Sequence, residues 1–206
     1  MKHLRTFVSG MLAGISIALG GTVFLSLENK VLGALFFTVG LFAVCTFGFH
    51  LYTGKVCYVF DNGCDYAIAL PVIWLGNLAG SWLTAAVESV TRFGPALAER
   101  AQTVSAAKLG DSPLSLFVLA VMCDLLIYVA VEGYRNNPHE LGKYLSIFFG
   151  VTVFILCGFE HCVANMYYFS MANAWSLRTL GLLLVMTAGN SVGGVLIPLL
   201  RKAAKP

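Results

Sequence analysis

Residues 158–166 read Gly-Phe-Glu-His-Cys-Val-Ala-Asn-Met, and this stretch decides the fold. It places Glu160 and His161 in the middle of an apolar run of about 32 residues, from Tyr144 to Trp175. One straight helix needs only about 20 residues to cross a bilayer. A glycine and two ionisable residues at the centre of so long a run predict two half-helices that meet at a break. Irregular backbone at membrane depth is tolerated only where it is buried in protein or lines a cavity, so we expect this break to line a pore.

The composition places the whole chain in a lipid bilayer. Of its 206 residues, 58% are hydrophobic and 11% are charged, and the mean hydropathy is +0.82; ordinary soluble domains carry about 25% charged residues. We expect a single transmembrane domain over residues 1–206, with no separate catalytic domain, no enzymatic activity and no cofactor. A formal net charge of +3 without a basic tract argues against a nucleic-acid partner.

Six apolar runs predict six spans. The second run, like the fifth, is too long for one plain span, and two glycines, a histidine and a lysine interrupt it at residues 48–55. Gly10 and Gly14 form a small-residue step that lets the first span pack closely against protein. A short surface helix is expected near residues 95–108. The spans lie at about residues 7–27, 31–60, 66–89, 114–134, 144–175 and 177–200.

The two halves of the chain resemble each other. Gly-Phe opens both breaks, at residues 48–49 and 158–159, and a Gly-Asn-x-x-Gly motif follows each, at residues 76–80 and 189–193. Three spans per half give the halves opposite orientations, and paired interrupted helices point to a transport site at the midplane. We therefore predict an all-α membrane protein of two inverted three-helix repeats, about 7–90 and 114–200, with helices two and five broken.

The distribution of Lys and Arg predicts the orientation. Six spans put both termini on one side, and placing them in the cytoplasm assigns seven basic residues to the inside and five to the outside. This bias has the sign that the positive-inside rule requires. We expect a multi-pass protein with both termini cytoplasmic.

The stretch GFEHCVANM resembles the GFEH-x-x-ANM signature of the formate/nitrite transporter family. Residues 50–54 lie where that family has an acidic-Leu-Phe-Thr loop, Asn77 and Asn190 fall in its Gly-Asn motifs, and Lys108 precedes span four at its spacing. The resemblance covers nearly the whole chain. It implies an aquaporin-like channel fold in a prokaryotic-type inner membrane, assembled as a homopentamer with one pore per protomer.

The resemblance also implies a substrate class and a pore lining. Small monovalent anions or their conjugate weak acids would pass: formate, nitrite, hydrosulfide, acetate and lactate. Thr53, His161 and Asn190 would lie at the pore centre, with Asn190 tying the loop of span two in place. By motif position the inner apolar constriction would be Phe37, Leu41 and Phe154, and the outer one Leu51, Tyr52 and Ile127.

Four positions depart from the family pattern. His50 replaces the acidic residue of the first break, Asp124 replaces the usual Asn of span four, Lys55 replaces a neutral polar residue, and Tyr52 replaces a Phe of the outer constriction. Lys55 and Asp124 are each costly alone at membrane depth, and opposite charges there tend to pair. We predict that they contact each other; the alternative is that Lys55 extends to the cytoplasmic interface.

His161 is the strongest candidate for a functional residue. A lone His on an apolar face is usually a satisfied core residue, but one at a helix break in a membrane favours pore lining. An unperturbed imidazole titrates near pH 6.5, roughly at physiological pH. A donor N–H from His161 would attract or protonate an entering anion, and a neutral acid crosses an apolar constriction without a large desolvation cost.

The other polar candidates have more than one interpretation. We favour Glu160 as a partner for free backbone N–H groups at the break, and Asn165, Asn77 and Asn190 as links between helices. His50 either faces the pore or caps a half-helix. Lys108 and Lys2 either draw anions to the pore mouth or are solvated surface charges.

The competing hypothesis is a membrane-embedded metal-binding or redox protein that uses Cys and His. Cys157 and His161 would share a helical face, but the predicted break between them spoils that spacing, and no CxxC pair supports it. We therefore expect no metal, and interpret the six cysteines as reduced, small apolar residues.

Overall fold

The structure, a computed structural model, describes the backbone of residues 2–204 and the side chains of residues 3–204. Helices account for nearly all of this range. In chain order they are α1 (Lys2–Ser26), α2 (Lys30–Phe37), α3 (Val39–Phe47), α4 (Tyr52–Val56), the 3-10 helix η1 (Val59–Asp61), α5 (Cys64–Ser89), α6 (Gly94–Leu109), α7 (Pro113–Asn136), α8 (Glu140–Cys157), α9 (Cys162–Met171) and α10 (Leu177–Ala203).

Six helical segments in the described range are long and apolar enough to cross a membrane, which confirms the predicted number of spans. The surface helix expected near residues 95–108 is α6. The six segments are His3–Ser26, Lys30–Phe47, Cys64–Ser89, Pro113–Asn136, Glu140–Cys157 and Leu177–Ala203.

The second and fifth spans are broken where the sequence predicted. Helix α3 ends at Gly48 and α8 ends at Gly158, and both glycines have φ = 70°. This left-handed conformation costs a glycine little and ends a helix. An extended residue then starts each following half-helix: Leu51 precedes α4 and His161 precedes α9.

The two halves repeat the same close helix pairing. In the first half α1 packs along α5, and Gly10 and Gly14 of α1 lie against the backbone of Gly76 and Asn77. This confirms the predicted small-residue contact. In the second half α10 packs along α7, and Gly189 and Gly193 lie against the backbone of residues 117–121.

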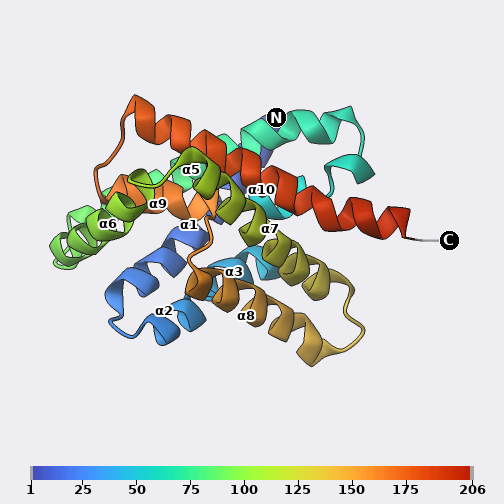
Figure 1. Cartoon of the computed structure of the whole chain (residues 1–206), viewed down its shortest axis with the longest axis horizontal. Helices are drawn as coiled ribbons and strands as arrows, with labels where there is room; N and C mark the ends of the chain where they lie inside the picture. The colour runs from blue at the N-terminus through green and yellow to red at the C-terminus, as the bar shows by residue number, and fades with distance from the viewer. Residues whose placement is uncertain (1, 205–206) are drawn as a thin grey trace.

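The spans run between two ends of the molecule, which Figure 1 separates (Figure 1). Helix α6 and the α1–α2 loop lie at the left, and the α7–α8 loop and the C-terminus lie at the right. We call these the α6 end and the terminal end. Helix α7 has 24 residues, a length of about 36 Å at 1.5 Å per residue, and it connects the two ends. Arg100 of α6 donates to the Leu27 carbonyl just after α1 (3.2 Å), so α1 begins toward the terminal end.

Gly14→Ala tests the α1–α5 contact. A Cβ at this position would lie 2.9 Å from Cα of Asn77, which is backbone that cannot turn away. We expect the free energy of unfolding to fall by about 1–3 kcal/mol, the usual cost of overpacking, measured as a lower Tm of purified protein in detergent. Gly181→Ala in α10 is the matched control, because a Cβ there meets nothing within 4 Å. Equal melting of the two variants would contradict this account of the packing.

Candidate functional site

The two breaks meet at Thr53 and His161. Thr53 Oγ1 lies 2.9 Å from His161 Nε2, and both side chains are buried. The other ring nitrogen, Nδ1, accepts a hydrogen bond from the Ala164 N–H (3.1 Å) and so caps α9. In a neutral imidazole the accepting nitrogen carries no hydrogen, so the hydrogen is on Nε2. His161 therefore points an N–H donor at the Thr53 hydroxyl.

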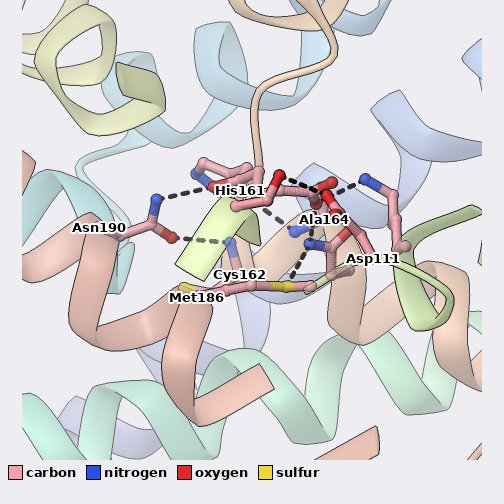
Figure 2. A network of polar contacts seen from close by, with 10 residues as sticks. Asp111, His161, Cys162, Ala164, Met186 and Asn190 are labelled. Atoms are coloured by element: carbon pink, nitrogen blue, oxygen red, sulfur yellow. Dashed lines mark hydrogen bonds and ion pairs between the residues drawn. The ribbon is translucent and has the colours of Figure 1, made fainter. Parts of the chain in front are cut away.

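An asparagine amide satisfies the backbone at each break. Asn190 Oδ1 accepts from the Cys162 N–H (2.8 Å), and its Nδ2 donates to the carbonyls of Glu160 and Ala120 (2.8 Å each). Figure 2 shows this amide reaching from α10 to the backbone beside His161 (Figure 2). Asn190 of the long helix α10 therefore holds both the start of α9 and the chain just before it.

Asn77 does the same for the first break. Its Oδ1 accepts from the Tyr52 N–H (2.8 Å), and its Nδ2 donates to the carbonyls of His50 (2.9 Å) and Gly10 (2.8 Å). The prediction that Asn190 ties the loop of span two was therefore wrong. Each asparagine lies on the last long helix of its own half and reaches the break of that half. Both N–H groups of the Asn190 amide donate to backbone carbonyls, so this side chain supports the break.

Glu160 has side-chain partners. Its Oε2 accepts from Lys108 Nζ (2.6 Å) and from Asn165 Nδ2 (2.7 Å). The interpretation that Glu160 binds free backbone N–H groups was wrong, because His161 Nδ1 and Asn190 Oδ1 already accept from them. Glu160 instead joins α6 to the break.

An aromatic pair packs against His161, and five of the six predicted constriction residues belong to one buried apolar cluster. The Phe154 ring stacks on the His161 imidazole (5.6 Å between centroids), and the Phe37 ring meets Phe154 edge-on at 6.0 Å. Five of the six residues predicted to form constrictions are almost fully buried, each 1% exposed: Phe37, Leu41, Leu51, Ile127 and Phe154.

Two separate cavities open on this apolar layer. The terminal cavity, about 240 Å³, is bordered by Leu41, Leu51, Lys55 and Arg135. The α6 cavity, about 360 Å³, is bordered by Lys108, Phe154, Glu160 and His161 among others. The two share no lining residue, so the buried layer separates them.

The predicted grouping of the two constrictions does not match the cavities. Phe154 borders the α6 cavity, whereas Leu41 and Leu51 both border the terminal cavity. Phe154 and Leu41, which were implied to share the inner constriction, therefore border different cavities, and Phe37 and Ile127 border neither. The reason is that α8 starts at the terminal end and carries Phe154 in its last turn, toward the α6 end.

Tyr52 and His50 line neither cavity. The Tyr52 hydroxyl contacts the Ser191 hydroxyl (2.9 Å), and its ring borders a lateral groove with Pro71 and Trp74. The side chain of His50 does not cap a half-helix, because Leu51 holds the cap position of α4. The Nδ1 atom of His50 has no hydrogen-bond partner among the described residues.

The predicted contact between Lys55 and Asp124 is wrong. Asp124 is 0% exposed, and neither carboxyl oxygen has a hydrogen-bond partner within residues 3–204. Its Oδ2 packs against Gly194, where an added Cβ would lie 2.5 Å away. Lys55 lies on α4, which leads toward the terminal end, and its side chain borders the terminal cavity.

Three basic residues complete the two cavities. Lys108 borders the α6 cavity, as its predicted role at a pore mouth requires, but it is paired with Glu160. Two basic residues were not predicted as site residues: Lys30 borders the same cavity and donates to the Leu156 carbonyl (3.1 Å), and Arg135 borders the terminal cavity. Both are basic residues at the edge of a span, a pattern that indicates orientation and not a site. The side chain of Lys2 lies outside the described residues.

The part of the chain that the structure describes contains no group of three or more His, Cys, Asp and Glu side chains placed to hold a metal ion. Cys157 is exposed at the end of α8, and the break separates it from His161, which is buried. The Cys and His residues therefore give the metal or redox hypothesis no support.

Asn190→Ala tests the support of the second break. It leaves the Cys162 N–H and two carbonyls without their partner, and each unsatisfied buried group costs about 1–3 kcal/mol. We expect the free energy of unfolding to fall by at least about 2 kcal/mol, measured by thermal melting in detergent. Asn62→Ala is the control, because Asn62 is exposed and makes one bond, to the Tyr58 carbonyl. A wild-type Tm for Asn190→Ala would show that the break does not depend on this amide.

Comparison with known proteins agrees with this geometry. The family model described as formate/nitrite transporter matches residues 1–203. The nitrite transporter NirC of Salmonella typhimurium is 30% identical over 217 residues, which cover 93% of this chain and 80% of the relative. The formate channel FocA of Haemophilus influenzae is 26% identical, with 82% and 67% covered.

Solved structures share the fold. A structure described as an FNT family ion channel superposes with a TM-score of 0.85 at 27% identity, covering 98% of this chain and 91% of the other. A pentameric formate channel with formate bound gives a TM-score of 0.80 at 24% identity, covering 98% and 96%. The predicted six-span fold with two broken helices is confirmed. This multi-pass membrane protein belongs to the formate/nitrite transporter family, whose members are channels and transporters.

Proposed function

We propose that the protein passes small monovalent anions, or their conjugate weak acids, through a pore in each protomer. Formate, nitrite, hydrosulfide and short carboxylates are the substrate class. Relatives described as a nitrite transporter and a formate channel support this proposal. The single observation that carries it is the Thr53–His161 contact, where the two broken helices meet between two cavities.

The permeation path would join the two cavities through the apolar layer. Phe37 and Phe154 form its α6 side, and Leu41, Leu51 and Ile127 form its terminal side. An apolar constriction stops hydrated ions and passes neutral or dehydrated species. Between the two sides, the Thr53 hydroxyl and the His161 N–H are the polar groups available to a permeating molecule.

His161 acts in this proposal as a hydrogen-bond donor. Its Nε2–H turns from the Thr53 hydroxyl to the oxygen of an entering anion or acid. Proton donation by an imidazolium is disfavoured, because both nitrogens would then be donors, and Nδ1–H would face the Ala164 N–H that it now accepts from. A proton that neutralises the anion therefore comes from water in the cavities. Of the two roles predicted for His161, the geometry favours attraction over protonation.

The assembly and location follow the same proposal. A homopentamer is supported by the solved channel described as pentameric. The basic residues Arg135, Lys143, Arg201 and Lys202 support cytoplasmic termini in a prokaryotic-type inner membrane. The chain would be one transmembrane domain with repeats at about 7–90 and 114–200, surrounded by the lipid bilayer and without covalent chemistry.

His161→Asn tests the proposed function. The Asn Oδ1 atom still accepts from the Ala164 N–H, because Asn is a good helix N-cap, while the donor to Thr53 is lost. We expect formate and nitrite flux into proteoliposomes to fall about 10- to 100-fold, since a hydrogen bond to a charged group contributes roughly 1.5–3 kcal/mol. The measurement is the flux of each substrate in the panel from pH 5 to 8, which is about the range over which imidazole titrates.

The control is His139→Asn at the exposed start of α8, where the side chain makes no cap bond. It is expected to transport as the wild type does. Wild-type flux and pH dependence in folded His161→Asn would overturn the role of His161. Metal bound to the purified protein, with no anion flux, would favour the metal-binding hypothesis instead.

A further inference from the structure

The two cavities differ in how their cations are paired. The α6 cavity is bordered by two cations, Lys30 and Lys108, and by two carboxylates, Asp111 and Glu160, and Lys108 Nζ lies 2.6 Å from Glu160 Oε2, so the charges of this cavity balance. Lys55 and Arg135 both border the terminal cavity. Within residues 3–204 neither makes an ion pair with a carboxylate. The terminal cavity therefore carries positive charge that the protein leaves uncompensated.

The acidic residues nearest the terminal end are already bound elsewhere. Glu132, one turn before Arg135 on α7, accepts from Arg201 (3.0 Å) and from the Tyr58 hydroxyl (2.9 Å). Glu140 pairs with Lys143, and Asp61 pairs with Lys202. The side chain of Arg135 is held over the Tyr58 ring, 4.6 Å from its centroid, a contact that leaves its planar donor edge free to bind an anion.

The remaining wall of the terminal cavity is apolar. Leu41 and Leu51 at the barrier, with Val44, Phe49 and Val131, face the same space as the two cations. Its volume of about 240 Å³ is below the roughly 300–1,000 Å³ of pockets for drug-sized ligands. A cationic side and an apolar side suit a small carboxylate whose hydrogen or short alkyl group packs toward the barrier.

We propose that the terminal cavity is a docking site for a small monocarboxylate, held by Lys55 and Arg135, and that the protein collects this anion mainly from the terminal end. The transport part rests on the proposed function; the cationic docking site does not. The α6 mouth draws anions less strongly, because Glu160 and Asp111 balance the charges of Lys108 and Lys30. The two mouths of the path are thus unequal, although the two halves of the fold are repeats.

The potential in the terminal cavity is measurable without transport, because Cys45 borders the same cavity. The exposed Cys64 and Cys157 are first replaced by Ser. The rates at which an anionic and a cationic methanethiosulfonate reagent modify Cys45 are then compared, with and without Lys55→Gln. One unit charge a few ångströms away in a water-filled space changes each rate about three- to tenfold, in opposite directions for the two reagents, so we expect the anionic-to-cationic rate ratio to fall about ten- to hundredfold.

Two further variants keep this measurement falsifiable. Lys55→Arg retains the charge and is expected to retain the ratio. Lys143→Gln removes the same charge from the same end of the molecule, but from a residue outside the cavity that is paired with Glu140, and is expected to leave the ratio unchanged. An unchanged ratio in Lys55→Gln, or a Cys45 that neither reagent modifies, would overturn the water-filled cationic cavity.

Transport measured separately from each end of the protein tests whether the anion is collected mainly from the terminal end. Formate uptake is compared in right-side-out and inside-out membrane vesicles. Lys55→Gln is expected to raise the half-saturating formate concentration about three- to tenfold when formate is supplied at the terminal end, and to leave supply from the α6 end unchanged. Equal effects from both ends would overturn preferential loading. If the wild type passes no formate, the proposed function fails, while the thiol ratio still decides whether the terminal cavity attracts anions.

Discussion

The structure depends on one kind of hydrogen bond, between an asparagine amide and the backbone of a broken helix. A break inside a bilayer frees N–H and carbonyl groups where no lipid atom can bind them. A primary amide offers both a donor and an acceptor, and Asn77 and Asn190 use both at their respective breaks. Gly48 and Gly158 make the turn possible, and the asparagines hold the chain that follows. Thr53 and His161 reach each other because both chains are held in this way.

What could be predicted from the sequence is what depends on local features. An apolar run that is too long, with a glycine and ionisable residues at its middle, indicates a break without knowledge of the neighbours, and the paired Gly-Asn motifs indicate the repeat. The partners of polar side chains depend on which groups are already bound. Glu160 binds Lys108 because other acceptors had taken the backbone N–H groups, and Lys55 misses Asp124 because α4 leads away to the terminal end. Arg135 was missed because a basic residue after a span indicates orientation alone.

The uneven charge of the two cavities follows from side chains that the repeat does not share. The backbone repeat places a break, an asparagine and a small-residue contact in each half, so the proposed path would have similar geometry from either end. Glu160 directly precedes His161 at one break, while Lys55 lies just after Thr53 at the other. The first brings a carboxylate to a lysine of α6, and the second brings a lysine to a cavity without a free carboxylate. A symmetric scaffold can therefore carry an asymmetric potential, and in a water-filled mouth that potential changes the local concentration of anions.

His161 joins the stability of the break to the chemistry of the path. One ring nitrogen accepts from the Ala164 N–H and starts α9, and this bond fixes the hydrogen on the other nitrogen, which faces Thr53. A second proton on the ring would turn the capping acceptor into a donor and oppose the start of α9. This geometry favours a neutral imidazole, and in the proposed path a neutral donor would suit a dry barrier, because it would bind an anion or an acid without adding a charge that would hold the anion in place. A lysine at this depth would bind the anion more tightly and release it more slowly, whereas conduction requires that a site be strong enough to fill and weak enough to empty.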